Sequence, residues 1–279
     1  MKPAKFDYER PADMAAAIKL VQRDDVVVKV LAGGQSLGPM LNLRLVQPDL
    51  LVDITGIPEL KRVEESGDAI VVGACVTHAD FEDGRVPQLT GGVLSRVARA
   101  IAYRAVRNRG TIGGSLVHAD PSADWISSLS AIGAEVILRG PSGQRRVPVD
   151  AFMTGVFETV LEQGEILEAV WIPRLSRKAR WGYYKLCRKT GEFAHAIGAV
   201  LHDPERSVCR AVIGATEAKP IVLTDARALF RGEPGTSLSS QFDPSVAKSI
   251  LFSAGMDDPL ESQLHVTALK RAVACAEHQ

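Results

Sequence analysis

The stretch AGGQSLGPM at Ala32–Met40 follows directly on the β-branched run VVVKVL. Such a run favours a buried strand, which we expect to end at the adjacent glycines Gly33 and Gly34. A glycine pair permits a tight turn and lets another group approach the backbone closely. Because exposed amide groups around such a turn can hold an anion, the amides of residues 33–37 and the Ser36 hydroxyl form a candidate phosphate site.

A second glycine pair lies in RNRGTIGGSLVHADPSAD, at residues 107–124. The amides of residues 112–115, beside the hydroxyls of Thr111 and Ser115, would form a second anion site of the same kind. Two such sites could hold the two phosphates of a dinucleotide. However, neither stretch matches a Walker A loop or the Rossmann G-x-G-x-x-G pattern. The residues alone therefore leave two interpretations open, a pair of ordinary turns or two halves of one binding site.

The composition is that of a globular protein and excludes several classes of function. The 279 residues are 46% hydrophobic and 24% charged, and the formal net charge is zero, so no nucleic-acid partner is expected. No apolar run approaches the ~20 residues that span a bilayer, and the first residues do not resemble a signal peptide. The cysteines Cys75, Cys187, Cys209 and Cys275 stand singly, which argues against a metal or iron–sulfur site in this chain. We expect a cytoplasmic protein without a membrane span.

Hydrophobic periodicity divides the chain into successive regions. Residues 1–55 are typical of a β-α-β unit, with a helix in PADMAAAIKLVQ whose first turn contains Pro11 and a strand at LLVDIT. A hairpin around Gly67 follows, and then a helical period over residues 91–106. After the second glycine motif come a helix in SADWISSLSAIG capped by Ser122, another hairpin and the strand EILEAVWIP.

The remaining part of the chain begins near RLSRKARWGYY, a charged stretch that follows a proline and predicts a domain boundary. Three alternating stretches come next, GYYKLCRK, AIGAVLHD and VCRAVIGAT. They fit an antiparallel meander of three strands. From residue 223 onward the pattern predicts helices.

The two glycine motifs carry a family resemblance. LAGGQSLGPMLNLRLVQPDLLVDIT together with RNRGTIGGSLVHADPSADW closely resembles the FAD-carrying medium subunit of the molybdenum hydroxylases. That family includes the flavoprotein subunit of carbon monoxide dehydrogenase and is similar to the flavin domain of xanthine dehydrogenase. The strands EILEAVWIP and YYKLCRK follow in the matching order.

The resemblance implies an α+β fold. It consists of a two-subdomain FAD-binding region of the PCMH type, similar to vanillyl-alcohol oxidase, followed by a C-terminal domain with a three-stranded antiparallel sheet and helices. We expect FAD-binding subdomain 1 at residues 1–55, FAD-binding subdomain 2 at 56–175 and the C-terminal flavoprotein domain at 176–279.

The resemblance also implies which residues bind FAD. Asp124 is expected to accept hydrogen bonds from sugar or ribityl hydroxyls, although the residues alone also allow a first-turn helix acid. Leu167 and Lys185 are expected to flank the flavin, with the lysine near a ring carbonyl or N1; a solvated strand lysine is the alternative. The residues expected at the pyrophosphate are Ala32, Gly33, Gly34, Gln35, Ser36 and Leu37 in the first motif and Thr111, Ile112, Gly113, Gly114 and Ser115 in the second.

Ser115 departs from the family pattern, because relatives often have asparagine at the end of this motif. His118 and Asp120 lie beside the second motif, and we expect FAD to be held non-covalently. Valine at Gly33 or Gly114 is expected to leave the fold intact but to abolish FAD binding.

The function implied by the resemblance is electron relay, so no catalytic residue is expected in this chain. A large molybdopterin-binding subunit would oxidise the substrate, and a small [2Fe–2S] subunit would pass the electrons to FAD on this chain. An external electron acceptor would then receive them, and the complex is expected to be a dimer of heterotrimers. Two alternatives stay open: a free-standing FAD-dependent oxidase or dehydrogenase, and a non-catalytic nucleotide-binding assembly protein.

Overall fold

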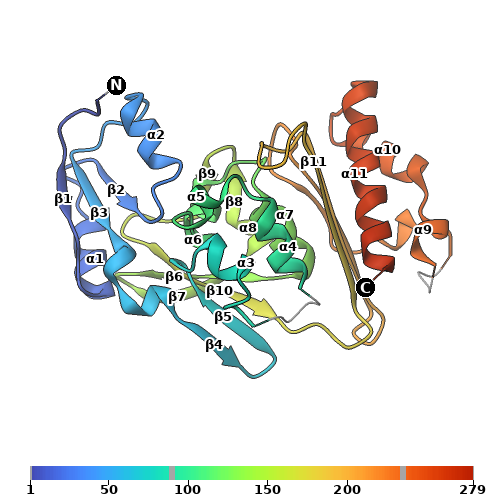
Figure 1. The fold of residues 1–279 in the computed structure, drawn as a ribbon, viewed down its shortest axis with the longest axis horizontal. Helices are drawn as coiled ribbons and strands as arrows, with labels where there is room; N and C mark the ends of the chain where they lie inside the picture. The colour runs from blue at the N-terminus through green and yellow to red at the C-terminus, as the bar shows by residue number, and fades with distance from the viewer. Residues whose placement is uncertain (1, 88–91, 233–236, 279) are drawn as a thin grey trace.

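A computed structural model of the chain describes residues 2–87, 92–232 and 237–278. Three main sheets follow one another along this part of the chain, with helices packed between them (Figure 1). The N-terminal unit, coloured blue in Figure 1, lies at one end of the molecule, and the C-terminal sheet with its helices lies at the other. Within the described residues, none of the helices combines the length and apolar character needed to span a membrane.

The N-terminal unit is a parallel three-stranded sheet in the order β1-β3-β2, which confirms the β-α-β arrangement and adds the strand β1. The strand β2 ends at Leu31, short of the glycine pair, and is only half-buried because it lies at the sheet edge. Pro11 precedes the helix, since Asp13 is the N-cap and accepts a hydrogen bond from the amide of Ala16 at 2.8 Å. The elements are β1 Asp7–Glu9, α1 Met14–Val21, β2 Val28–Leu31, α2 Leu37–Asn42, β3 Leu50–Asp53 and the 3₁₀ turns η1 Ile54–Gly56 and η2 Pro58–Lys61.

The central unit is an antiparallel sheet in the order β4-β5-β10-β6-β7, and both predicted hairpins and the strand EILEAVWIP are present. Gly67 makes the first hairpin turn with a φ of +57°, a conformation that glycine adopts without strain. The strands are β4 Val63–Ser66, β5 Ala69–Gly73, β6 Glu135–Gly140, β7 Gly143–Pro148, β8 Met153–Gly155, β9 Glu158–Thr159 and β10 Ile166–Pro173.

The helices of the central unit differ from the expected pattern in two places. The period over residues 91–106 is split into α4 and α5 by a bend at Ile101–Tyr103, and Gly91 lies outside the described residues. The N-cap of α7 is Ala123 rather than Ser122, whose amide instead donates to Asp120 Oδ1 at 2.8 Å. The helices are α3 His78–Glu82, α4 Val93–Ala100, α5 Arg104–Arg107, α6 Ile112–His118, α7 Asp124–Ile132 and α8 Val149–Phe152.

The C-terminal sheet contains the predicted antiparallel meander, extended at its edge by a short fourth strand, β14. Because β14 and the short turn η3 occupy the start of the region from residue 223, helix begins later there than the pattern indicates. The elements are β11 Arg180–Leu186, β12 Ala196–Asp203, β13 Val208–Gly214, β14 Ile221–Leu223, η3 Arg227–Leu229, α9 Leu238–Gln241, α10 Pro244–Ser253 and α11 Pro259–Glu277.

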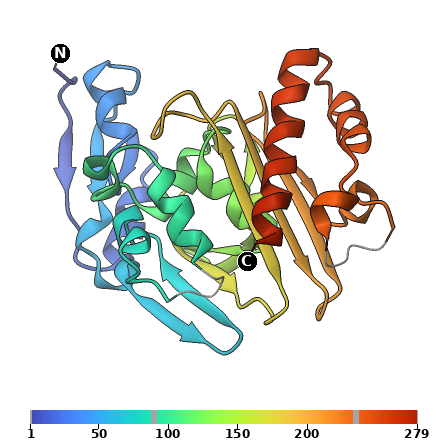
Figure 2. The same ribbon diagram turned by 45° about the vertical axis from the view of Figure 1, so that its right-hand side comes forward.

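Small residues let helices approach both faces of the C-terminal sheet. A Cβ on Gly182 would lie 1.9 Å from the carbonyl oxygen of Ala272 in α11, which lies across one face of the sheet (Figure 2). On β13, a Cβ on Gly214 would lie 1.9 Å from Ser127 Oγ in α7. Since α7 belongs to the central unit, this packing fixes the C-terminal sheet against the region that carries the second glycine motif.

His265 in α11 is fully buried, and neither ring nitrogen has a hydrogen-bond partner among the described residues. The Glu261 carboxylate lies 4.0 Å from its Nε2. Burial lowers the pKa of His265 from 6.5 to about 4. Because the folded-state pKa is the lower one, the unfolded chain binds more protons between these values, and this histidine reduces stability as the pH falls through that window.

We predict that His265→Leu makes the chain more resistant to acid. The wild type should lose about 2 kcal/mol of unfolding free energy through this histidine between about pH 7 and pH 5, and the variant should not. Urea unfolding across this pH range measures the difference, with His195→Leu, at an exposed position, as the control. An equal pH dependence in wild type and His265→Leu would contradict the prediction.

Candidate cofactor site

The two glycine motifs meet through their backbones. A Cβ on Gly33 would lie 2.2 Å from the carbonyl oxygen of Arg109 and 2.7 Å from the Cα of Gly110. Glycine is therefore required at Gly33 by the packing of one motif on the other. The expectation that Gly33→Val leaves the fold intact is wrong for this reason. At Gly114 the clash is milder, because an added Cβ would lie 2.9 Å from Thr111 Oγ1.

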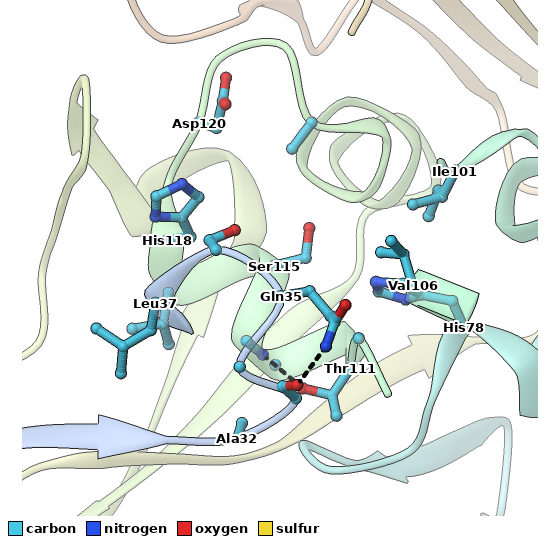
Figure 3. A pocket seen from close by; sticks show the side chains of 18 of the residues that line it. Ala32, Gln35, Leu37, His78, Ile101, Val106, Thr111, Ser115, His118 and Asp120 are labelled. Atoms are coloured by element: carbon cyan, nitrogen blue, oxygen red, sulfur yellow. Dashed lines mark hydrogen bonds between the residues drawn. The ribbon is translucent and has the colours of Figure 1, made fainter. Parts of the chain in front are cut away.

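The first motif offers a set of free amides. Gly34 turns the chain with a φ of +70°, and α2 begins at Leu37. Within the described part of the chain, no acceptor takes a hydrogen bond from the amides of residues 33–37. The Gln35 side chain instead donates to the Gly33 carbonyl at 3.1 Å, which braces the turn (Figure 3). This arrangement supports the predicted anion site.

The amides of the second motif, by contrast, are already used. Those of Ile112 and Gly113 donate to carbonyls of the segment after β5, at 3.0 and 2.9 Å. Those of Gly114 and Ser115 donate to Thr111, to its side-chain oxygen and its carbonyl, both at 3.0 Å. The expected second amide site is therefore absent, because these groups join α6 to the central unit. The groups of the second motif that can bind an anion are instead the hydroxyls of Thr111 and Ser115.

Both motifs line one cavity of about 700 Å³, a volume typical of small-molecule sites. Figure 3 shows side chains from α2, α3 and α6 gathered around it. Ile112 is the exception among the predicted site residues, since its side chain is fully buried in the core and does not line the cavity. The predicted residues that line it are Ala32, Gly33, Gly34, Gln35, Ser36, Leu37, Thr111, Gly113, Gly114, Ser115, Asp124, Leu167 and Lys185.

A buried ion pair forms the wall at the start of α7. Lys185 Nζ lies 3.0 Å from Asp124 Oδ2, and each side chain is 6% exposed. The alternative of a solvated strand lysine is therefore wrong, whereas Asp124 is both a first-turn helix acid and a cavity residue. The Tyr183 hydroxyl donates to Asp124 Oδ1 at 2.7 Å. Burial, together with the nearby Asp124 carboxylate, raises the pKa of Tyr183 well above 10.

His78 is a cavity residue that no sequence motif indicates. Its ring is 5% exposed, and its Nδ1 accepts a hydrogen bond from the Trp125 indole at 3.0 Å. Burial, assisted by the Arg107 charge, lowers the pKa of His78 to about 4. The ring is therefore neutral near pH 7, and its proton is on Nε2. The only local signal is the capping box of Thr77 and Asp80, which predicts the start of α3 but not a site.

His118 and Asp120 also line the cavity, as their positions beside the second motif suggest (Figure 3). The His118 ring packs against the ring of Phe157, with centroids 5.0 Å apart. Asp120 is engaged locally through the amide of Ser122.

The donor set fits FAD. The free amides of residues 33–37 suit a phosphate group, and the buried carboxylate of Asp124 retains lone pairs that can accept from hydroxyl groups. Apolar groups such as Leu167 and Ile101 provide walls for a flat ring. The chain thus combines an anion site, hydroxyl acceptors and apolar surface in a single cavity.

We predict that Asp124 and Lys185 are strongly coupled in the FAD-free chain. Asp124→Asn or Lys185→Met leaves a buried charge without its partner, so each should cost about 3 kcal/mol of unfolding free energy. The double variant should lose clearly less than the sum, because it leaves neither charge. Denaturant unfolding of the four proteins measures the coupling. Additive losses would show that the pair does not interact as the distances indicate.

Comparisons with known proteins identify the family of the chain. The model of the family described as the FAD binding domain in molybdopterin dehydrogenase matches residues 4–175. The carbon monoxide dehydrogenase medium chain of Hydrogenophaga pseudoflava is 37% identical over 224 residues, which cover 80% of this chain and 78% of that one. The nicotine 6-hydroxylase medium subunit of Paenarthrobacter nicotinovorans is 34% identical, with 83% and 82% covered.

A solved structure is similar over almost the whole length. It is a carbon monoxide dehydrogenase from Hydrogenophaga pseudoflava that lacks the Mo-pyranopterin moiety, and the TM-score is 0.86 at 31% identity. The match covers 99% of this chain and 98% of that chain. The fold, the cavity and these relatives agree, and the chain therefore belongs to the family of FAD-binding medium subunits of molybdenum hydroxylases.

Proposed function

We propose that this chain is the electron-transfer subunit of a heterotrimeric molybdenum hydroxylase or dehydrogenase. In this proposal it receives electrons from the [2Fe–2S] clusters of a small subunit and passes them via FAD to an external acceptor. A large molybdopterin-binding subunit completes the heterotrimer, and two heterotrimers pair. The names of the relatives support it, since they are medium chains and subunits of dehydrogenases and hydroxylases. The cytoplasmic location expected from the sequence stays a prediction.

One observation supports FAD as the ligand of the cavity most strongly, the free amides of residues 33–37 beside a cavity of about 700 Å³. We propose that these amides and the Ser36 hydroxyl bind the pyrophosphate, with the Thr111 and Ser115 hydroxyls on its other side. FAD when bound accepts electrons singly and can deliver them in pairs, which suits a junction between clusters and a two-electron acceptor.

The remaining cavity residues hold and orient the flavin end in this proposal. Asp124 accepts hydrogen bonds from sugar or ribityl hydroxyls while it keeps its bonds to Lys185 and Tyr183. Lys185 supplies the positive charge nearest to the ring, and Leu167 excludes water from it. We also propose the division of the chain into units at 1–55, 56–175 and 176–279. The end of the family match at residue 175 supports the second of these boundaries.

We predict a specific order of ligand affinity for the full chain. FAD should bind most tightly and ADP should compete with it, because both present a pyrophosphate to the free amides. Riboflavin, which lacks phosphate, should bind about 100-fold more weakly than FAD, since it forgoes charge-assisted hydrogen bonds. Titration calorimetry measures the order. Equal affinity for FAD and riboflavin would contradict a pyrophosphate site at the first motif.

The same preparation separates the alternatives. The chain alone should show the visible absorbance of bound flavin but no sustained turnover of alcohols or sugar acids. Co-purified with its large and small subunits, it should be reduced when the substrate of the complex is added. Sustained turnover by the chain alone would support a free-standing oxidase or dehydrogenase, and failure to bind FAD would support an assembly protein.

A further inference from the structure

The bend at Ile101–Tyr103 between α4 and α5 forms one wall of the cavity. At its centre Ala102 has a φ of +41°, a left-handed conformation that is unfavourable for a non-glycine residue. Gly191 packs against it, because a Cβ at that position would lie 2.8 Å from the Ala102 carbonyl oxygen. A strained conformation of this kind persists only where the surroundings hold it.

Arg107 stabilises the bend from the side that does not face the cavity. Its Nη1 donates to the carbonyls of Ile101 and Ala102 at 2.9 and 2.8 Å. The rest of the guanidinium binds both carboxylate oxygens of Glu82, at 2.7 and 3.1 Å. Arg107 is 9% exposed and is not among the residues that line the cavity, so it acts on the cavity through the wall.

A second cation holds the preceding carbonyl. Lys185 Nζ lies 3.3 Å from the Ala100 carbonyl oxygen while it pairs with Asp124. The carbonyls of three successive residues, 100–102, thus bind two cations, Lys185 and Arg107. Each cation is paired with a carboxylate of its own. The amides of Ala102 and Tyr103 donate to no acceptor in the described part of the chain. The bend therefore leaves the apolar Ile101 side chain and free amides for a ligand (Figure 3).

Arg107, with its bonds to Glu82 and to the carbonyls of Ile101 and Ala102, forms a clamp on the bend. Glu82 connects this clamp to another part of the cavity. It is the last residue of α3, and His78 is the first. The capping box of Thr77 and Asp80 fixes the start of that short helix. The clamp thus ties the bend to the element that carries the His78 ring.

We propose that Arg107 is a positioning residue for the cofactor, which fixes the Ile101–Tyr103 wall in the conformation that receives the flavin ring. Glu82 orients its guanidinium. This inference rests on the proposed binding of FAD in the cavity.

The test compares two arginines of α5 in the full chain. Arg107→Met removes the clamp, and Arg104→Met is the matched control. Arg104 also binds Glu82, at 2.9 Å, but its side chain is 47% exposed and its other partners are Asp83 and Asn108, not the wall. We expect the Kd for FAD to rise about tenfold in Arg107→Met, because the wall is no longer pre-organised, and to stay within about twofold in the control.

Two further readouts separate positioning from general loss of structure. The visible circular dichroism of bound flavin should change in Arg107→Met. In the FAD-free chain, hydrogen exchange should be faster at the amides of Ile101 and of residue 107, which donate to the carbonyls of Ala98 and Tyr103 at the two ends of the bend. Arg107→Lys, which has three donors on one nitrogen in place of the planar fork that makes four hydrogen bonds here, should rescue only in part. Glu82→Gln keeps Arg107 but weakens its carboxylate partner, so it should change the Kd for FAD, the flavin circular dichroism and the exchange in the same direction as Arg107→Met, by a smaller amount. It provides the test if Arg107→Met does not fold.

Failure of the positioning role of Arg107 can be distinguished from failure of the proposed function. If wild type binds no FAD, that function fails, while hydrogen exchange still reports whether Arg107 holds the wall. If wild type binds FAD and both Arg107→Met and Glu82→Gln match it in Kd, flavin circular dichroism and exchange, the positioning role is wrong. A loss of equal size in Arg104→Met would also overturn it, since that residue touches no wall carbonyl.

Discussion

The backbone contact between the two glycine motifs is the constraint on which the rest of the site depends. Gly33 lies against Arg109 and Gly110 so closely that even one methyl group would lie 2.2 Å from a carbonyl oxygen. This contact joins the N-terminal parallel sheet to the central unit, and the cavity lies where they meet. A substitution at Gly33 would therefore change the shape of the site before it changed any contact with a ligand.

Buried charge gives the same cavity its rigidity. A charge that is removed from water is tolerated only when a partner and further hydrogen bonds compensate for the loss of hydration. Asp124 with Lys185 and Glu82 with Arg107 meet that condition. In both pairs the cation has donors left over. Those of Arg107 bind two carbonyls of the bend at Ile101–Tyr103, and Lys185 binds the preceding carbonyl, that of Ala100. The pairs thus fix the wall before any ligand binds, which limits the ordering cost of binding.

Local pattern predicts much of this fold, because strand periodicity, turn glycines and the two motifs are properties of short segments. The site residues implied by the resemblance in those same segments line the cavity, apart from Ile112, whereas the cavity residue His78 does not follow from it. Properties that depend on distant partners are not predictable in this way. The amide of Gly113 is unavailable because it donates to a carbonyl of another segment. Likewise, the pairing of Lys185 with Asp124 joins positions 61 residues apart, and the left-handed Ala102 packs against Gly191 from another segment.

The most direct measurement is a crystal structure of the full chain with FAD bound. The pyrophosphate oxygens should lie within hydrogen-bond distance of the amides of residues 33–37, and the flavin ring should lie against the bend at Ile101–Tyr103 with Lys185 nearby. The amides of residues 112–115 should keep their internal bonds. A pyrophosphate bound by the amides of the second motif, or a flavin ring outside this cavity, would contradict a site in which the first motif alone supplies free amides.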